Sequence, residues 1–234
     1  GKARLALFHS TAGREGYALL LSRARELAPP GVRRLFLFLP SALDSPGDYL
    51  RESGFAVERV ALSLGREDLE APQARLPPGW SLEALAPGQH GPAADFAAVR
   101  NRNFLELTGS APTTAEDWLK VLDGKDLVPE GLVLLRDPEG QARASLLVEA
   151  ESPEDDSEAI SIGALSVDPE LRRQGLGRAL LWHALSLGRR AGFSRAHLSV
   201  DSENDKALGL YRAEGFVLRK SMACWAAELE GIGP

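Results

Sequence analysis

The chain has 234 residues, 44% of them hydrophobic and 26% charged, which is typical of a folded protein with one large domain or two average ones. Its formal net charge of −6 argues against a dedicated nucleic-acid binder. No apolar run approaches the ~20 residues that span a bilayer, and no signal segment opens the chain, so we expect no membrane partner. Cys224 is the single cysteine, which excludes an intrachain disulfide and a cysteine-rich metal site and predicts a cytoplasmic location without a bound metal.

The chain repeats itself at an offset of 161 residues, which aligns Gly16–Phe55 on Gly177–Phe216 without a gap (177 − 16 = 161). Twelve of the forty aligned residues are identical, where random pairing gives about three. Each copy predicts an apolar strand, a glycine-containing turn, a helix, a second strand, a second helix and a Gly-Phe pair before a third strand. We therefore predict an internal structural repeat, whose first copy lies in a domain of residues 1–70.

A proline-rich stretch, residues 71–80, predicts a linker to a second domain of residues 80–230. A run of carboxylates at residues 149–158 predicts a solvated hairpin tip. The other elements expected in the second domain are, in chain order, a strand at 80–85, a helix at 92–107, a helix at 113–122 capped by a threonine, strands at 131–137 and 142–150 around a turn, a strand at 159–167, and a helix at 175–191 that ends at Gly192.

The strand at 159–167, "AISIGALSV", contains a break in its alternation. Ile160 and Ile162 are apolar on one parity, whereas Leu165 and Val167 are apolar on the other. The phase must slip between residues 162 and 165, and Gly163, a frequent bulge residue, stands at the slip. A bulge separates a strand from its neighbour, so we expect unpaired backbone N–H groups there that bind a ligand.

The segment after this strand, "DPELRRQGLGRALL", predicts an anion site. Gly175 and Gly177 allow a close backbone approach, and a helix N-terminus offers free N–H groups and a partial positive charge. With Arg172 and Arg173 alongside, the arrangement suits a pyrophosphate, although a plain helix start with solvated arginines has the same residues. The Rossmann and P-loop patterns both fail here, the first at Leu180 and the second at Arg178.

"LSVDPELRRQGLGRALL" resembles the acetyl-CoA signature of the GCN5-related N-acetyltransferase (GNAT) superfamily, Arg/Gln-x-x-Gly-x-Gly/Ala after a strand. "NDKALGLYRAEGF" resembles the second half of that family's motif, at Asn204, Ala207, Leu210, Tyr211, Gly215 and Phe216. "RNRNFLEL" and "TTAEDWLK" resemble the acceptor-side helices of tandem members such as mycothiol synthase. The resemblance covers about residues 80–228.

The resemblance implies an α/β (α+β) GNAT fold: a mixed central sheet with a bulged fourth strand and helices on both faces, preceded by a partial GNAT-like repeat. It implies direct acetyl transfer from acetyl-CoA, as co-substrate, to a primary amine within a ternary complex. The strand backbone would hold the pantetheine arm, and the loop and helix start the pyrophosphate. The cofactor-binding residues so implied are Leu165, Ser166, Val167, Arg172, Arg173, Gln174, Gly175, Leu176, Gly177, Arg178, Ala179, Asn204, Ala207 and Tyr211.

Tyr211 occupies the family's general-acid position, and a phenol with a reference pKa of ~10 is protonated at neutral pH. The sequence does not select the general base. Where relatives often carry acidic residues, this chain has Gly163 and Ser199. Either the amine proton would leave through water to Glu203, Glu149 or His197, or the acceptor amine would arrive already neutral.

The first copy lacks the residues with chemical roles. At the same offset, Arg172, Arg173, Gly175, Asn204, Ala207 and Tyr211 correspond to Thr11, Ala12, Arg14, Leu43, Pro46 and Leu50. We therefore interpret this copy as a degenerate half-domain that supplies structure. Two other functions stay open, a non-catalytic acyl-CoA-binding module and a Fem-type aminoacyl transferase. The acceptor is a small-molecule amine or a peptide N-terminus, and the oligomeric state is not indicated.

Overall fold

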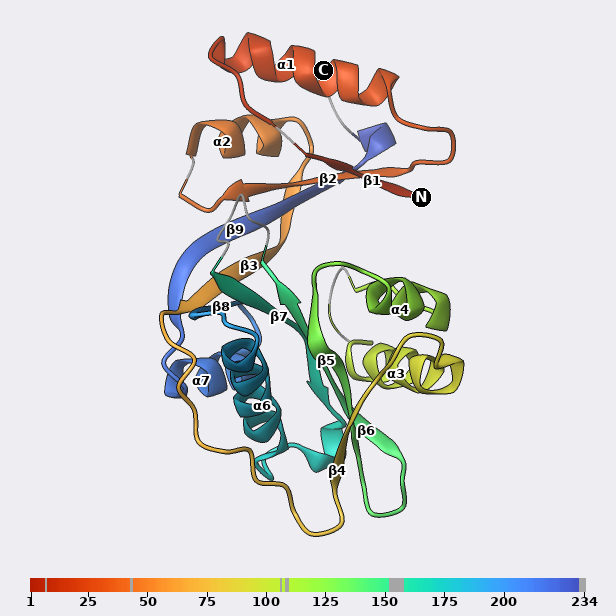
Figure 1. Cartoon of the computed structure of the whole chain (residues 1–234). Coiled ribbons are helices and arrows are strands. Elements are labelled where there is room, and N and C mark those ends of the chain that lie inside the picture. The colour runs from red at the N-terminus through yellow and green to blue at the C-terminus, as the bar shows by residue number, and fades with distance from the viewer. Residues whose placement is uncertain (7, 43, 106, 108–109, 152–157, 232–234) are drawn as a thin grey trace. The chain divides into compact units, whose positions relative to one another are not determined.

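The computed structural model describes residues 1–6, 8–42, 44–105, 107, 110–151 and 158–231 (Figure 1). The carboxylates Glu154, Asp155 and Asp156, expected at a hairpin tip, lie outside these ranges. The chain divides into two compact units. The first comprises Gly1–Leu64, Val200–Tyr211 and the chain from Leu218 onward, and the second comprises Gly65–Ser199 and Arg212–Val217.

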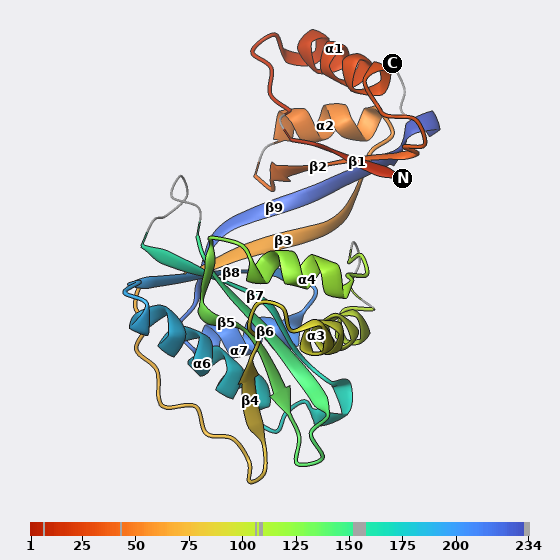
Figure 2. The same ribbon diagram turned by 45° about the vertical axis from the view of Figure 1, so that its right-hand side comes forward.

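The first unit is a sheet with two helices on one face (Figures 1 and 2). Its strand order is β1-β2-β9-β3, with β1 parallel to β2 and β2 antiparallel to β9. The C-terminal strand therefore adds to the sheet begun by the N-terminal residues. The elements are β1 (Lys2–Leu5), α1 (Gly13–Glu26), β2 (Arg34–Pro40), α2 (Asp44–Glu52), β3 (Ala56–Arg66) and β9 (Val217–Glu228).

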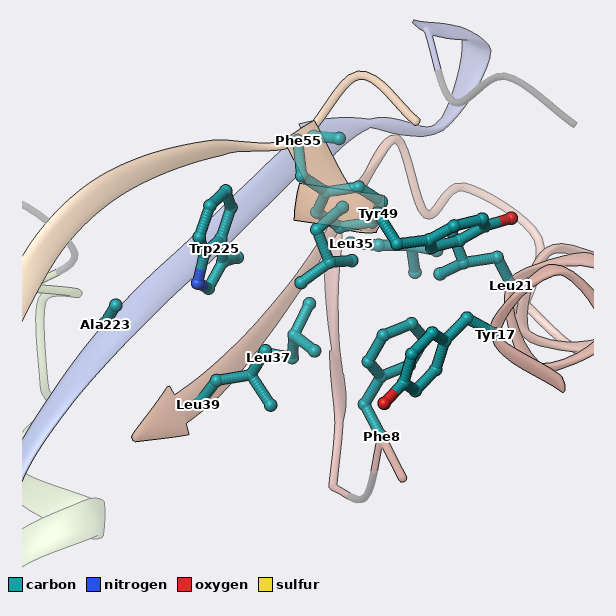
Figure 3. Close-up of a cluster of buried hydrophobic side chains, with 12 residues drawn as sticks. Phe8, Tyr17, Leu21, Leu35, Leu37, Leu39, Tyr49, Phe55, Ala223 and Trp225 are labelled. Carbon is teal, nitrogen blue, oxygen red and sulfur yellow. The ribbon is translucent and has the colours of Figure 1, made fainter. Parts of the chain in front are cut away.

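Buried side chains from both helices and two strands form the core of this unit (Figure 3). Alternate residues of β2, among them Leu35 and Leu37, face the helices and are 1% exposed. The rings of Phe8 and Tyr17 stack with their centroids 5.0 Å apart. Leu50 of α2 is fully buried in the same cluster, so this unit has a core of its own, to which the C-terminal strand contributes Trp225.

The second unit is a mixed sheet with the strand order β8-β7-β6-β5-β4. Helix α6 packs on one face, and α3 and α4 pack on the other, as Figure 2 shows. This bears out the predicted fold class. Its elements are β4 (Ser81–Ala84), α3 (His90–Asn103), α4 (Ala115–Leu122), β5 (Leu127–Arg136), β6 (Ala142–Ala150), β7 (Ala159–Val167), a 3₁₀ turn (Pro169–Leu171), α6 (Leu176–Arg190) and β8 (Arg195–Asp201). Helix α7 (Asp205–Ala213) follows β8 and belongs, up to Tyr211, to the first unit.

The sequence repeat reappears in the element bounds. Adding 161 to Arg34–Pro40 gives 195–201, the bounds of β8, and adding 161 to Asp44–Glu52 gives 205–213, the bounds of α7. Gly54 and Gly215, which end the two helices, share a positive φ of 89° and 82°. The order strand, helix, strand, helix, strand thus occurs twice, as predicted.

The compact units do not follow the repeat. Residues 200–211 and those from 218 onward belong with the first unit. For the C-terminal part of β9 the reason is its pairing with β2, which runs from Arg34↔Glu228 to Pro40↔Met222. The domain boundaries near residues 70 and 80 remain a prediction. In the described ranges no helix has the length and the apolar surface needed to cross a bilayer.

Local sequence signals place most element ends. Thr114 caps α4: its hydroxyl accepts a hydrogen bond from the Asp117 N–H, and the Asp117 carboxylate accepts one from the Thr114 N–H. Helix α3 is shorter at its C-terminus than predicted, ending at Asn103 rather than 107. The last helical bond runs from the Phe104 N–H to the Arg100 carbonyl, and the Leu107 N–H then donates to the Phe104 carbonyl, three residues back instead of four.

Two glycines predict opposite responses to an added methyl group. At Gly131 in β5 a Cβ atom would collide with the Val148 and Val128 carbonyl oxygens, whereas at the exposed Gly209 inside α7 it would meet nothing within 4 Å. We expect Gly131→Ala to lower the free energy of unfolding by about 1–3 kcal/mol and Gly209→Ala to raise it by about 0.5–1 kcal/mol. Urea denaturation of both variants tests this, and equal effects would contradict it.

Candidate functional site

Strand β7 carries an extra residue at the point where its alternation slips. Between Ser145 and Leu147 on β6 the register advances two residues, while β7 advances three from Gly163 to Ser166. Ala164 and Leu165 therefore oppose a single residue of β6, which defines a β-bulge. The bulge lies where the sequence predicted it, but the positive φ, 45°, belongs to Ala164 and not to Gly163.

The bulge coincides with the end of the pairing between β7 and β8. Their parallel register runs from Ala159↔Arg195 to Ile162↔Leu198, whereas β7 continues to Val167. Among the described residues, the backbone of β7 beyond Ile162 has a register partner only on β6. Its other edge can therefore offer N–H and C=O groups to a ligand.

The chain then turns into the start of α6. Arg173 has a φ of 64° and Gly175, the N-cap residue, a φ of 85°, so two left-handed residues reverse the chain within three positions. No side chain caps the helix, which leaves first-turn N–H groups open beside the exposed Arg172 and Arg173. This geometry matches a site for a phosphate or another anion.

Two of the predicted loop residues have little to offer such an anion. The N–H of Ala179 donates to the Gly175 carbonyl at 2.9 Å, and its side chain is buried. Leu176 is 1% exposed, so it presents only its backbone. Arg172 is exposed, and its Nε donates to the Val167 carbonyl at 3.1 Å, which places the guanidinium beside the end of β7.

Asp168 fixes the junction between β7 and the loop. Its side chain is 4% exposed and its carboxylate accepts from the Arg102 guanidinium, with an Nη2–Oδ1 distance of 2.8 Å. Arg143 lies 3.5 Å from the other oxygen. A buried carboxylate needs such partners because removal from water penalises its charge. The loop thus begins from an anchored point.

The stretch "RNRN" at residues 100–103, at the end of α3, supplies these anchors. Arg100 donates to the Ala111 carbonyl at 2.6 Å, and Asn101 bonds to Thr113 through both its amide nitrogen and its amide oxygen. Arg102 binds Asp168, and Asn103 donates to the Ser166 hydroxyl at 3.0 Å. Two of these side chains therefore hold the α3–α4 connection, and two hold the bulged strand.

Arg178 and Trp182 of α6 share one carboxylate. Glu214 accepts from the Arg178 Nε at 2.7 Å and from the Trp182 Nε1 at 2.6 Å. Its backbone carbonyl accepts from Arg66 at 2.9 Å. Arg178, predicted to bind the cofactor, is thus oriented by Glu214, the residue that precedes the Gly-Phe corner of the second copy.

The remaining predicted residues lie on α7 and its N-terminus, in the first unit. Asn204 caps α7, with its side-chain oxygen accepting from the Ala207 N–H at 3.2 Å. Tyr211 is 7% exposed, and burial raises the pKa of its phenol to about 12. The phenol therefore stays protonated throughout the neutral range, as a general acid must.

Two of the three open base candidates share one row of the second unit's sheet. Ser161 of β7 pairs with Glu149 on β6 and with His197 on β8. His197 Nδ1 lies 3.7 Å from a Glu151 oxygen. Burial, and then the charges of Asp126 and Glu151, raises the pKa of Glu149. Glu203, the third candidate, precedes α7 in the first unit.

The corresponding positions of the first copy serve internal contacts. Arg14, which replaces Gly175, pairs with Glu52, and its guanidinium lies 5.4 Å from the centroid of the Tyr49 ring. Leu50, which replaces Tyr211, is fully buried. Leu43, which replaces Asn204, lies outside the described residues.

Comparison with known proteins gives a consistent result. The model of the acetyltransferase (GNAT) family matches residues 110–216. A mycothiol acetyltransferase of Geodermatophilus obscurus is 30% identical over 88% of this chain and 67% of its own length. The chain belongs to the GNAT family of acetyltransferases. Acetyl-CoA-dependent acyl transfer is therefore its class of reaction, as the sequence predicted.

Further relatives agree with this assignment. A mycothiol acetyltransferase of Salinispora arenicola is 29% identical over 94% of this chain and 69% of that protein. A GCN5-related N-acetyltransferase of Sphaerobacter thermophilus has the same fold, with a TM-score of 0.70, 23% identity, and coverage of 92% of this chain and 66% of that one. A tandem GNAT protein from the clavulanic acid biosynthesis pathway has a TM-score of 0.63, 20% identity, and coverage of 94% and 70%.

Sequence reasoning missed several residues of this candidate site. Ser145, Asn103 and Arg102 support the bulge and the loop from outside the quoted acetyl-CoA motif, and Asp168 lies within that motif but was given no role. The available signal was a polar residue in an otherwise apolar strand, Ser145 in "ASLLV", and the unusual run "RNRN" at a helix end. Among the described residues, no three His, Cys, Asp or Glu side chains gather as a metal site would require.

The raised pKa of Glu149 predicts that replacing this carboxyl group with a neutral amide stabilises the protein by an amount that depends on pH. A carboxyl group whose pKa rises on folding contributes stability below its unfolded pKa, and that contribution is lost as the pH rises through the folded pKa. We therefore expect Glu149→Gln to raise the melting temperature more at about pH 8 than at about pH 5.

Differential scanning calorimetry at the two pH values measures this difference. Glu139→Gln, at an exposed position in the turn between β5 and β6, controls for the loss of one negative charge. The same gain at both pH values in Glu149→Gln would contradict the interpretation.

Proposed function

We propose that this protein transfers the acetyl group of acetyl-CoA directly to a primary amine within a ternary complex. The observation that carries the proposal is a single continuous segment: a strand whose outer edge is unpaired past Ile162, followed at once by an uncapped helix start with two left-handed residues. The first part suits the extended pantetheine arm, and the second suits the pyrophosphate of the same molecule.

The backbone around Leu165, Ser166 and Val167 would hydrogen-bond the pantetheine amides and the thioester carbonyl. The first-turn N–H groups of α6 would receive the pyrophosphate, assisted by Arg172 and Arg173, with Gln174 and Gly177 in the same loop. Arg178 would add positive charge from the orientation that Glu214 gives it. Asn204 and Ala207 would contribute to cofactor binding at the start of α7, where the Asn204 side-chain oxygen accepts a hydrogen bond from the Ala207 N–H.

The amine must lose a proton as it attacks, and the departing thiolate must gain one. Tyr211 would protonate the thiolate, and its pKa of about 12 supports this role because the phenol keeps its proton at neutral pH. Glu149 would take the amine proton, with water between them. Burial raises the pKa of Glu149 toward the working range of a general base. Glu149 is also the register partner, on β6, of Ser161 on the bulged strand β7.

The first copy would supply structure only. Its helix start carries an arginine that is paired with Glu52, and a leucine stands in the core where the second copy has its tyrosine. A second acetyl-CoA site in the first copy would therefore lack the acid and the glycine at the helix start.

The acceptor is a small-molecule amine or a peptide N-terminus. Several relatives are named for mycothiol, so the first acceptor to test is mycothiol without its acetyl group. A cytoplasmic location follows from the use of acetyl-CoA as the donor.

A panel of amines incubated with acetyl-CoA tests the proposal. Free CoA and the acetylated product are both measured by chromatography with mass spectrometry, because an acceptor with a thiol of its own would react with a thiol dye. The panel contains des-acetyl mycothiol, an amino sugar, an aminoglycoside and a short peptide with a free N-terminus. We expect amine-dependent thiol release with at least one of them. Acetyl-CoA binding without release would instead identify a non-catalytic module, and failure to bind at millimolar concentration would reject the acetyl-CoA site.

Replacement of the acid gives a sharper prediction. Tyr211→Phe should lower kcat by about 10²–10⁴-fold while leaving the Kd for acetyl-CoA nearly unchanged, because the phenol acts on the leaving thiolate. Tyr49→Phe is the matched control: Tyr49 is 6% exposed and its hydroxyl has no hydrogen-bond partner among the described residues. An unchanged kcat in a folded Tyr211→Phe variant would reject the acid role.

A further inference from the structure

A buried chain of polar groups connects the end of α3 to the bulge of β7. The Asn103 amide nitrogen lies 3.0 Å from the Ser166 hydroxyl, which lies 2.7 Å from the Ser145 hydroxyl. The Ser145 hydroxyl lies 2.7 Å from the Ala164 carbonyl oxygen. Ser145 is fully buried and Ser166 is 8% exposed, so these groups depend on one another and not on bulk water.

The direction of every proton in this chain is determined. A carbonyl oxygen only accepts, so Ser145 must donate its one proton to Ala164. Ser166 must then donate to Ser145, and the Asn103 amide nitrogen must donate to Ser166. If the Asn103 amide were turned round, its oxygen would take the Ser166 proton and leave the 2.7 Å contact between the two serines without a hydrogen.

This chain of polar groups also orients a backbone N–H group, that of Leu165. All described peptide bonds are trans, so the N–H of Leu165 points opposite to the C=O of Ala164 in the same rigid plane. The Ser145 hydroxyl binds that carbonyl, so the Leu165 N–H points away from this hydroxyl. On the side of β7 away from β6, the pairing with β8 ends at Ile162.

The same peptide needs support because its conformation is unfavourable. Ala164 has a φ of 45°, in the left-handed region that costs a residue with a Cβ atom about 1 kcal/mol or more. Such a conformation persists only where its surroundings determine it. Here the Ser145 hydroxyl binds the carbonyl of that residue directly.

We propose that Ser145, oriented through Ser166 by Asn103, is a positioning residue that aims the Leu165 N–H at the carbonyl oxygen of the acyl thioester. The inference rests on the proposed function, since it assigns the donor of that same site. As the amine attacks, the thioester oxygen gains negative charge and its hydrogen bond to a fixed N–H strengthens. The contribution of Ser145 is therefore greater in the transition state than in the acetyl-CoA complex.

Ser145→Ala tests the proposal. We expect kcat to fall about ten-fold or more, less than the about 10²–10³-fold that follows deletion of an oxyanion donor itself, with a change in KM for acetyl-CoA of less than about three-fold. Val148→Ala is the control, because Val148 is equally buried on the same strand but on its other face. It should lower stability without changing kcat.

A binding measurement separates this inference from the proposed function. Acetyl-CoA and CoA differ only by the acetyl group, so Ser145→Ala should shift the ratio of their Kd values, measured by calorimetry, against acetyl-CoA. This ratio is measurable even if no amine is acetylated, in which case the proposed function fails and the positioning role is still tested. A folded Ser145→Ala variant with unchanged kcat and an unchanged ratio would overturn the inference.

Asn103→Asp keeps the test decisive if Ser145→Ala does not fold. Asn103 is only half-buried, and an aspartate of the same shape accepts but does not donate. It should draw the Ser166 proton away from Ser145 and lower kcat in the same direction as Ser145→Ala. Wild-type values of kcat and of the Kd ratio in Asn103→Asp would overturn the inference.

Discussion

A strand with one residue too many cannot stay in register with both of its neighbours. In β7 the extra residue is accommodated against β6, and the pairing with β8 ends at Ile162, two residues before the left-handed Ala164. The edge that this leaves without a register partner in the described part of the chain is the physical basis of the proposed acyl-donor site. The turn at Asp168, the left-handed Arg173 and Gly175, and the start of α6 continue directly from it.

Such an edge would be lost if the bulge were free to slip, and the end of α3 prevents this. Arg102 and Asn103 hold the strand through Asp168 and Ser166, while Arg100 and Asn101 hold the connection to α4. The elements expected to face the acceptor are therefore bonded to the strand expected to hold the donor. This gives a structural reason for a polar run at the end of a helix that otherwise packs with apolar residues.

The two copies of the repeat show how one framework supports different roles. Both keep the Gly-Phe corner, with Gly54 and Gly215 in the same conformation and Phe55 and Phe216 each 2% exposed. The residue before the glycine differs. Ser53 is buried in the first copy, whereas Glu214 in the second binds Arg178 and Trp182. The corner is thus a packing unit in both copies, and only one copy uses it to orient a cation of the loop.

The sequence by itself determined the family, the order and bounds of most elements, the repeat and the position of the bulge. These follow from local patterns: alternation and its slip at Gly163, glycine spacing before α6, and Thr114 as a cap. Only the tertiary structure decided that Ala164 takes the positive φ, that Ser145 and Asn103 orient the bulge, and that β9 completes the sheet of the first unit. Each of these features depends on contacts between residues that lie tens to more than a hundred positions apart in the sequence. Packing and the need to pair buried polar groups bring these residues together, and a local sequence pattern contains no information on such contacts.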